Sequence, residues 1–259
     1  MFCVQDLVSI ITPSYNSSSF ISETITSILS QTYTNWELLI SDDCSTDDSV
    51  QIIEQFAKQD PRIKLFRLEK NSGAGVCRNR SIQEAKGRFI AFCDSDDCWK
   101  PEKLERQIAF MLERDCALSY TSYLVCDEQS KVNGIVVART RETYVSMQCD
   151  DGIGCLTAMY DTQKVGKIYM PELRKRQDWG LWLKILEKCG VAYGMKEPLA
   201  IYRVRSGSIS RNKLSLVKYN LNVYKKVLRF SALKSYLFFY FVFLPSYFVK
   251  KLGQKYVNR

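Results

Sequence analysis

Acidic side chains in three parts of the chain have the types and spacing to carry chemistry: Asp42-Asp43, Asp94-Ser95-Asp96-Asp97 and Asp178. Asp94 and Asp96, two residues apart on an expected loop, can present carboxylate oxygens to a hard divalent cation such as Mg²⁺ or Mn²⁺. Such a cation usually completes its coordination shell with water and substrate phosphates, so the pattern favours a phosphate ester or diphosphate substrate. The structural alternative is that Asp96 or Asp97 caps the helix expected to begin near Pro101.

The absence of histidine from the 259-residue chain excludes several classes of enzyme. Ser-His-Asp and Cys-His hydrolases, histidine-ligated metal sites and imidazole acid–base catalysis are all ruled out. Carboxylates, Lys, Tyr, Ser and Cys remain as the groups that could react. The ten cysteines are scattered without a Cys-x-x-Cys pair, so we expect reduced thiols, and the N-terminal residues do not predict a signal peptide.

Short apolar runs alternate with amphipathic stretches from the N-terminus, which predicts βα units and a mainly parallel sheet. The expected strands are 7–12, 36–41, 63–68 and 88–93, with helices near 20–29, 48–58, 74–86 and 101–114, the third of them capped by Gly87. Beyond residue 114 the alternation weakens, with strands expected at 117–126, 132–138 and 200–204 and a helix at 179–186. The expected fold class is α/β, with a Rossmann-like, mostly parallel central sheet that becomes mixed in its second half.

The three acidic clusters fall at or just after expected strand ends. In an open α/β sheet, ligands bind beyond the carboxyl ends of the strands, so the clusters should converge there. For Asp42-Asp43 a capping role is equally open, with Ser45 or Thr46 as the N-cap of the next helix. Arg78 and Arg80 lie just inside an expected helix and could neutralise a diphosphate, although solvation at the surface is the ordinary role of a single arginine.

The net charge of +9 is carried by the C-terminal tail, where residues 211–259 hold eleven Lys or Arg and no acidic residue. Segment 230–249 has nine aromatic residues, and its charge-free part, 235–249, would reach about 22 Å as a helix, short of the ~30 Å hydrocarbon core. We therefore divide the chain into a domain at 1–210 and an amphipathic helical tail at 211–259, expected to lie on an anionic membrane surface. Packing on the protein's own core or on a second copy, as in a homodimer, is the alternative, and nucleic acid is not an expected partner.

Seven motifs, in order, resemble those of family 2 glycosyltransferases. They are Val8-Ser-Ile-Ile-Thr-Pro-Ser-Tyr-Asn16, Ser30-Gln-Thr-Tyr33, Ile40-Ser-Asp-Asp-Cys-Ser-Thr-Asp47, Gly75-Val-Cys-Arg-Asn-Arg80, Ala85-Lys-Gly87, Phe92-Cys-Asp-Ser-Asp-Asp97 and Gln177-Asp-Trp179, and Tyr202-Arg-Val-Arg-Ser-Gly207 continues the match. The resemblance implies the GT-A fold, a nucleotide-sugar donor, a divalent metal, Mn²⁺ or Mg²⁺, and inverting transfer to a hydroxyl.

The resemblance also implies roles for individual residues. Thr12 and Tyr15 correspond to nucleotide-contacting residues, Asp43 to the carboxylate that hydrogen-bonds the uracil base, and Arg78 to a residue near the nucleotide diphosphate. Asp96 corresponds to the direct metal ligand, Asp94 to a contact with the ribose or a metal-bound water, and Asp178 to the catalytic base. Two departures from the family pattern are Cys44, where Gly is common, and Cys77, where Ala is usual.

The tail and the resemblance together favour a peripheral enzyme at the cytoplasmic face of the bacterial inner membrane, acting in surface-polysaccharide (O-antigen or capsule) synthesis. The expected donor is UDP-glucose or UDP-galactose, and the expected acceptor is a lipid-linked sugar, N-acetylglucosamine-diphosphate-undecaprenol, giving a β-linkage. Asp150, Asp151 and Tyr160 are expected on the acceptor side. The alternatives are an Asp-x-Asp phosphatase or phosphotransferase and a non-catalytic membrane-docking protein.

Overall fold

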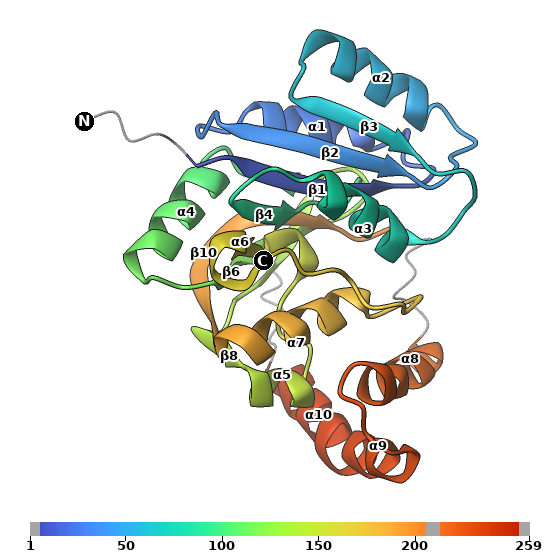
Figure 1. Ribbon diagram of the computed structural model, residues 1–259, viewed down its shortest axis with the longest axis vertical. Coiled ribbons are helices and arrows are strands. Elements are labelled where there is room, and N and C mark those ends of the chain that lie inside the picture. The colour runs from blue at the N-terminus through green and yellow to red at the C-terminus, as the bar shows by residue number, and fades with distance from the viewer. Residues whose placement is uncertain (1–5, 206–212, 254–259) are drawn as a thin grey trace.

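The computed structural model describes residues 6–205 and 213–253, which form one mixed sheet flanked by helices (Figure 1). The strands are β1 (Val8–Ser14), β2 (Trp36–Asp42), β3 (Ile63–Arg67), β4 (Phe89–Phe92), β5 (Cys98–Trp99), β6 (Leu118–Cys126), β7 (Val132–Val136), β8 (Arg141–Thr143), β9 (Met159–Asp161) and β10 (Val191–Arg203). The helices are α1 (Ile21–Leu29), α2 (Ser49–Gln59), α3 (Ala74–Glu84), α4 (Lys103–Glu113), α5 (Tyr144–Cys149), α6 (Thr162–Val165), α7 (Gln177–Cys189), α8 (Lys213–Lys226), α9 (Ala232–Phe238) and α10 (Leu244–Gly253), with a 3₁₀ turn at Cys155–Thr157 and a π-helical turn at Phe239–Phe243.

The strand order confirms the expected change from a parallel to a mixed sheet. It is β3-β2-β1-β4-β9-β6-β10-β5, with β7 paired to β6 and β8 to β10. Strands β1 to β4 pair in parallel, whereas β9 runs antiparallel between β4 and β6. Strand β10 begins at Val191 rather than near residue 200, because Gly190, with a φ of 76°, turns the chain directly out of α7.

Gly87 does not cap α3 as expected, because the helix ends at Glu84 and Ala85 at its C-cap is extended. The glycine is instead required where the chain passes β1. A Cβ atom on Gly87 would lie 2.6 Å from the Leu7 carbonyl oxygen and from the Ser9 amide nitrogen. Its own amide donates to Ser9 Oγ at 2.8 Å. Close approach to a neighbouring strand, rather than helix termination, therefore explains this glycine.

Neither of the capping alternatives for the acidic clusters is correct. Helix α4 begins at Lys103 with Glu102 as its N-cap, so neither Asp96 nor Asp97 caps it. Helix α2 begins at Ser49 with Asp48 as its N-cap, so Ser45 and Thr46 do not cap that helix either. The acidic side chains are therefore available for other contacts.

Apolar side chains on both faces of the sheet hold the strands in place. On one face, Ile25 and Ile28 of α1 and Leu104 of α4 are fully buried, as their helical spacing predicts. On the other face, Trp182 of α7 packs edge-on against Phe92 of β4, with ring centroids 5.4 Å apart. Each such side chain contributes roughly 2–3 kcal/mol by burial. This packing fixes the end of β4, which leads into the Asp94 loop, relative to α7, which carries Asp178.

The tail has one buried and one exposed face. Tyr224 and Phe243 are buried against Trp179 of α7, with ring centroids 5.7 and 5.6 Å away, so packing on the protein's own core accounts for part of the aromatic segment. On the other face, Leu233 is 71% and Phe241 73% exposed. Figure 1 places α8–α10 at the opposite end of the molecule from α2. The expected domain boundary at 210/211 lies outside the described residues, as do Ser206 and Gly207 of the last motif.

No helix within residues 6–205 and 213–253 combines the length and the apolar character needed to cross a membrane.

Candidate active site

The acidic loop after β4 is fixed to the neighbouring strand β10. The backbone N–H of Arg203 donates to Asp97 Oδ1 at 2.9 Å, and Asp97 is buried. Burial, followed by the charges of Asp96 and Asp94, raises the pKa of Asp97 well above its ordinary value. Asp97 therefore holds the loop in place while Asp94 and Asp96 remain partly exposed.

Asp94 is paired with a buried arginine of α3. Arg78 Nη2 lies 2.5 Å from Asp94 Oδ1, and only 8% of the Arg78 side chain is exposed. Burial alone would lower the pKa of Arg78, but the charges of Asp94, Cys155 and Asp178 together with the Asp94 hydrogen bond outweigh it and raise that pKa above its ordinary value. The guanidinium is therefore a fixed positive charge at the end of β4. The structure thus brings Arg78 and Asp94 together as expected, whereas Arg80 pairs with Glu84 on its own helix.

Asp96 has an arginine partner of its own. Arg205 Nη1 lies 3.0 Å from Asp96 Oδ2. Burial and then the charge of Asp94 raise the pKa of Asp96, and the Arg205 guanidinium opposes that shift. The two carboxylates expected to serve a metal thus repel each other, and each is compensated by a separate guanidinium.

Asp178 lies in the first turn of α7 and lines the same cavity as Asp94 and Asp97. The cavity has a volume of about 570 Å³, and its lining also includes Arg139, Asp151, Arg176 and the aromatic side chains of Tyr120, Tyr123 and Tyr202. Asp96 is not among the lining residues. The end of β4 and the start of α7, about 80 positions apart in sequence, therefore meet at one cavity large enough for a sugar ring.

Asp43 supports the loop that leads into α3. Its two carboxylate oxygens accept the backbone N–H groups of Ser72 at 2.6 Å and Gly73 at 2.8 Å. The adjacent Cys44 has a φ of 62°, in the left-handed region that favours glycine. The thiol of Cys44 donates to the Leu68 carbonyl oxygen at 3.0 Å. The left-handed conformation gives a physical reason why glycine would suit this position.

Thr12 and Tyr15 differ sharply in exposure. Thr12 on β1 is fully buried, and its hydroxyl has no hydrogen-bond partner among the described residues. Tyr15, just after the strand, is half exposed. Neither lines the cavity that holds Asp94 and Asp178, so the structure does not bring these two residues to that point.

Of the three residues expected on the acceptor side, the structure places only Asp151 in the cavity lining. Asp150 is buried and pairs with Arg139 at 3.1 Å. Tyr160 is fully buried, and its hydroxyl donates to the Ile168 carbonyl oxygen at 3.4 Å. The expectation for Tyr160 is wrong because β9 inserts between β4 and β6, which directs this side chain into the core.

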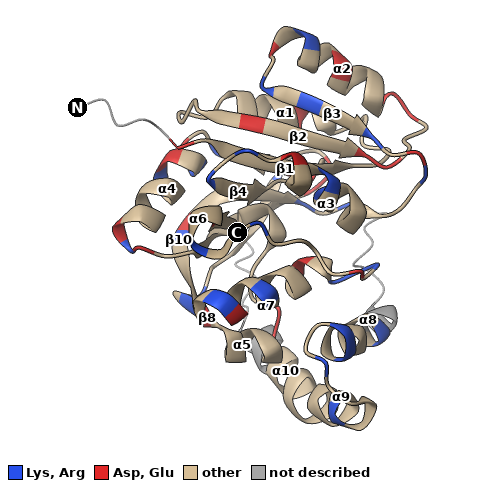
Figure 2. Cartoon of the chain, in the orientation of Figure 1, with Lys and Arg blue, Asp and Glu red and all other residues tan. Residues whose placement is uncertain are grey.

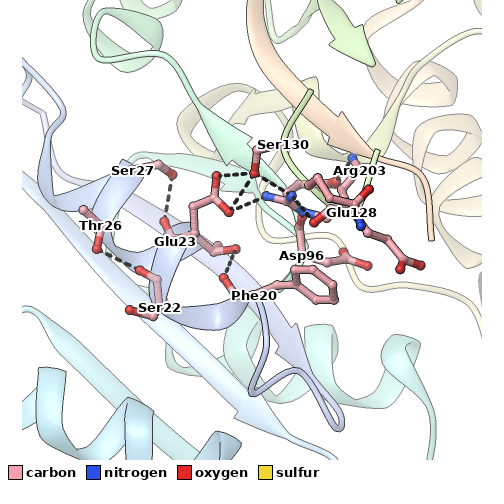
Figure 3. Close-up of polar contacts among 12 residues, drawn as sticks. Phe20, Ser22, Glu23, Thr26, Ser27, Asp96, Glu128, Ser130 and Arg203 are labelled. Atoms are coloured by element: carbon pink, nitrogen blue, oxygen red, sulfur yellow. Dashed lines mark hydrogen bonds and ion pairs between the residues drawn. The ribbon is translucent and has the colours of Figure 1, made fainter. Parts of the chain in front are cut away.

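Arg203 is a residue to which the sequence reasoning gave no role, although it lies in the quoted motif that starts at Tyr202. Figure 3 shows its guanidinium between Glu23 of α1 and Ser130 of the β6–β7 loop. Nη2 lies 2.5 Å from Glu23 Oε2, and Nη1 donates to Ser130 Oγ at 2.8 Å. Nε donates to the backbone carbonyl oxygen of Asp96 at 3.0 Å. This arginine therefore fixes the main chain of the acidic loop from β10.

Comparisons with known proteins agree with this arrangement. The family model described as glycosyl transferase family 2 matches residues 9–156. The chain is 45% identical over 230 residues to TuaG of Bacillus subtilis (strain 168), assigned as a teichuronic acid biosynthesis glycosyltransferase, covering 88% of this chain and 91% of that one. It is 42% identical over 213 residues to the Escherichia coli protein WfgD, named UDP-Glc:alpha-D-GlcNAc-diphosphoundecaprenol beta-1,3-glucosyltransferase, covering 82% of this chain and 83% of that one.

Solved structures give the same fold. The crystal structure of Staphylococcus aureus TarS 1–349 in complex with UDP-GlcNAc matches with a TM-score of 0.68 at 23% identity, over 88% of this chain and 69% of that chain. The expected α/β fold of GT-A type is therefore confirmed. Taken with the family model and the identities of 45% and 42%, this shows that the chain belongs to glycosyl transferase family 2.

Proposed function

We propose that the protein transfers glucose from UDP-glucose to a hydroxyl of N-acetylglucosamine-diphosphate-undecaprenol, forming a β-linkage in bacterial surface-polysaccharide synthesis. WfgD and WfaP, which are 42% and 37% identical to this chain, are both named as β-1,3-glucosyltransferases with that donor and acceptor. UDP-galactose is the second candidate donor. The observation that carries the proposal is that Asp94 and Asp178 line one cavity of about 570 Å³.

A divalent cation, Mn²⁺ or Mg²⁺, is the proposed cofactor, with Asp96 as its direct ligand. Among the described residues, no group of three or more acidic or cysteine side chains could hold a metal ion. Two neighbouring carboxylates fit a cation that completes its shell with substrate diphosphate and water. Burial and the charge of Asp94 raise the pKa of Asp96, so added positive charge is favoured there. When bound, the cation would supply positive charge against the departing diphosphate.

The chain's own residues have distinct proposed tasks in the transfer. Arg78, fixed and charged beside Asp94, stabilises the negative charge that grows on the diphosphate as the anomeric bond breaks. Asp178 accepts the proton of the acceptor hydroxyl as that oxygen attacks from the opposite face of the sugar. Asp94 contacts the ribose or a metal-bound water. One such displacement inverts the anomeric centre, so an α-linked donor gives a β-linked product.

Thr12, Tyr15 and Asp43 are proposed to contact the nucleotide. The Asp43 oxygens already accept two backbone N–H groups, so this carboxylate is held rigidly and keeps further lone pairs for the base. Thr12 is fully buried and Tyr15 is half exposed, so Tyr15 is the better placed of the two to meet the nucleotide.

The transfer reaction is tested by incubating the purified full chain with UDP-glucose or UDP-galactose, Mn²⁺ and a synthetic N-acetylglucosaminyl-diphosphate lipid. We expect UDP release coupled to a β-linked disaccharide lipid, identified by NMR of the new anomeric proton, and loss of the reaction in EDTA with recovery on adding Mn²⁺. A phosphatase would release inorganic phosphate without any acceptor. Full turnover in chelator would exclude the metal, and the absence of a disaccharide product with every UDP-sugar would exclude the proposed reaction.

The exposed face of the tail is proposed to bind the cytoplasmic face of the inner membrane. Leu233, Leu237, Tyr240, Phe241 and Phe248 are exposed at helical spacing along α9–α10. Lys226, Arg229 and Lys234 are exposed nearby, and the colouring in Figure 2 marks basic and no acidic residues along the described parts of α8 and α9. Apolar residues beside cations suit an anionic leaflet, where each basic residue contributes about 1 kcal/mol.

Cosedimentation with vesicles tests the membrane surface. Wild type should bind vesicles that contain phosphatidylglycerol and bind pure phosphatidylcholine poorly, and Leu233→Ser with Phe241→Ser should reduce that binding. Leu112→Ser changes an exposed leucine on α4 and serves as the matched control. A dimer that dissociates in the tail variant, without any vesicle binding by wild type, would identify a second copy as the partner instead.

A further inference from the structure

Arg176 immediately precedes the helix that carries Asp178 and lines the same cavity. Its φ of 65° places it in the left-handed region at the N-cap of α7, a conformation that a non-glycine residue adopts only when its surroundings enforce it. Nη1 lies 3.0 Å from Asp151 Oδ2, and Nε donates to Asn220 Oδ1 at 3.0 Å. The third nitrogen, Nη2, has no acceptor among the described residues. The guanidinium is therefore oriented at the cavity wall with a donor to spare.

Among the charged residues that line the cavity, Arg176 is the one best suited to bind an anionic group. Asp94, Asp97, Asp151 and Asp178 are acidic, so an anionic group entering the cavity needs a cation to offset them. Arg139 is the other arginine of the lining, but both of its terminal nitrogens pair with carboxylates, one on Glu142 and one on Asp150. Arg176 pairs with a single carboxylate, so it can accept a second anionic partner.

The position of Arg176, two residues before Asp178, suits the proposed acceptor. That acceptor is a sugar with a diphosphate on its anomeric carbon and the reacting hydroxyl elsewhere on the same ring. Two residues along a chain span at most about 7 Å, which is comparable with the width of one pyranose ring. A cation two residues before the base can therefore hold the phosphate side of the ring while the hydroxyl reaches Asp178. Guanidinium groups bind phosphate oxygens with paired hydrogen bonds.

The tail helix α8 holds this segment through side-chain contacts. Asn220 of α8 accepts a hydrogen bond from Arg176 Nε–H. Lys175 Nζ lies 5.2 Å from the ring centroid of Tyr219, which is also on α8. One helical turn further on, Tyr224 packs on Trp179, which follows Asp178 directly. The same helix thus contacts residues on both sides of Asp178, and it leads into the exposed apolar face at Leu233 and Phe241.

We propose that Arg176, held by Asn220, binds the diphosphate of the lipid-linked acceptor, with the lipid leaving toward the tail. This inference rests on the proposed function and names the group that recognises the acceptor. The tail then has a second task besides membrane contact, because α8 orients the residue that places the acceptor sugar against the base. Arg176 is a binding residue in this account, and Asn220 is a positioning residue.

Two acceptors distinguish the proposed site from a general structural role. One is a synthetic N-acetylglucosaminyl-diphosphate lipid, and the other is the same sugar on the same lipid without phosphate. For Arg176→Gln we expect the acceptor KM of the diphosphate lipid to rise about tenfold or more, the donor KM to stay within twofold, and the weaker reaction with the uncharged lipid to remain unchanged. Arg176→Lys should recover part of the loss because it restores the charge, and Asn220→Ala should raise the same KM by a smaller factor.

Arg174→Gln removes an equal charge from an exposed position two residues earlier and is the matched control, with an expected change below twofold. Melting temperatures of all variants establish that each is folded, and if Arg176→Gln does not fold, Asn220→Ala and Arg176→Lys carry the test. Equal losses with both acceptors, or an equal loss in Arg174→Gln, would overturn the inference alone. Wild type that transfers to neither acceptor would overturn the proposed function together with it.

Discussion

The carboxylate of Asp96 and the guanidinium of Arg205 form an ion pair, with 3.0 Å between Oδ2 and Nη1. Asp94 is paired in the same way with Arg78, so the two partly exposed acidic residues of the loop are both compensated before any substrate enters. A divalent cation that binds Asp96 must compete with Arg205 for that carboxylate. Separation of the pair would leave Arg205 available to face the diphosphate, whose charge it could help to neutralise.

Arg205→Gln should therefore tighten Mn²⁺ binding when no donor is present. The ion pair is partly exposed, so its loss corresponds to roughly 1 kcal/mol, or about fivefold in affinity. Titration followed by Mn²⁺ electron paramagnetic resonance measures this directly. Arg106→Gln, which breaks an exposed pair with Glu197, is the control. Unchanged or weaker Mn²⁺ binding in Arg205→Gln would show that the two cations do not compete.

Asp96→Ala should abolish transfer while leaving the fold intact. The main chain at this position is held through its carbonyl oxygen by Arg203 Nε, and the substitution keeps that hydrogen bond. We expect a melting temperature within a few degrees of wild type, measured by circular dichroism, together with loss of product in the transfer assay. Undiminished transfer in the folded variant would exclude the proposed ligand role.

Burial of Lys103 should make the stability of the folded protein depend on pH, independently of catalysis. The ammonium of Lys103 is fully buried, donates to Gln107 Oε1 at 2.6 Å and lies 4.2 Å from the Trp99 ring centroid. Burial lowers the pKa of Lys103 from 10.5 to about 7. Between these values the unfolded chain binds a proton that the folded chain does not, so the stability of wild type relative to Lys103→Met should rise with pH from about 7 to 10.

The expected rise is on the order of 3–5 kcal/mol across that window, and below pH 7 the difference between the two proteins should level off. Urea unfolding at a series of pH values measures it, with Lys58→Met on the exposed face of α2 as the control for the substitution. A difference that is flat or falls between pH 7 and 10 would mean that Lys103 stays protonated in the folded protein.

At Cys44, we expect glycine to be tolerated better than valine. Because the φ of Cys44 is 62°, Cys44→Gly should stay within about 1 kcal/mol of wild type, the relief of strain offsetting the lost thiol hydrogen bond and the greater freedom of the unfolded chain. Cys44→Val should lose about 1–3 kcal/mol, since a β-branched residue is poorly accommodated at positive φ. Urea midpoints of the two variants test this, and a valine variant as stable as the glycine variant would contradict it.

The first half of the fold could be predicted because strand and helix periodicity alternate there with short connections. Strands β1 to β4 lie within two residues of their expected bounds. Of the three acidic clusters expected to converge, the Asp94 loop and Asp178 line one cavity, whereas Asp42 and Asp43 do not. Asp178 lies in the first turn of α7 and not after a strand, so the rule for strand ends does not account for its position. The second half could not be placed in the same way. Strand β9 is three residues long and pairs antiparallel between distant strands, so nothing local in the sequence shows that Tyr160 is a core residue.

Polar contacts between residues far apart in the chain could not be predicted from the sequence either. Arg203 binds Glu23, which is 180 positions away, and Ser130 on a third element. No periodicity or capping pattern relates these residues, because their proximity arises only when β10 closes against the acidic loop. The two faces of the tail illustrate the same limit: composition indicated an apolar helix, but the choice of which aromatic side chains pack on Trp179 depends on the tertiary fold.

The central claim is that Asp178 acts as the base in the cavity that also holds the Asp94 loop. Asp178→Asn keeps the size of the side chain and removes its basicity, so the most direct measurement is its turnover with UDP-glucose, Mn²⁺ and the diphosphate lipid acceptor. We expect kcat to fall by about 10²–10⁴ while UDP-glucose binding, measured by calorimetry, stays within twofold of wild type. An Asp178→Asn variant that keeps more than about a tenth of wild-type kcat would contradict the account.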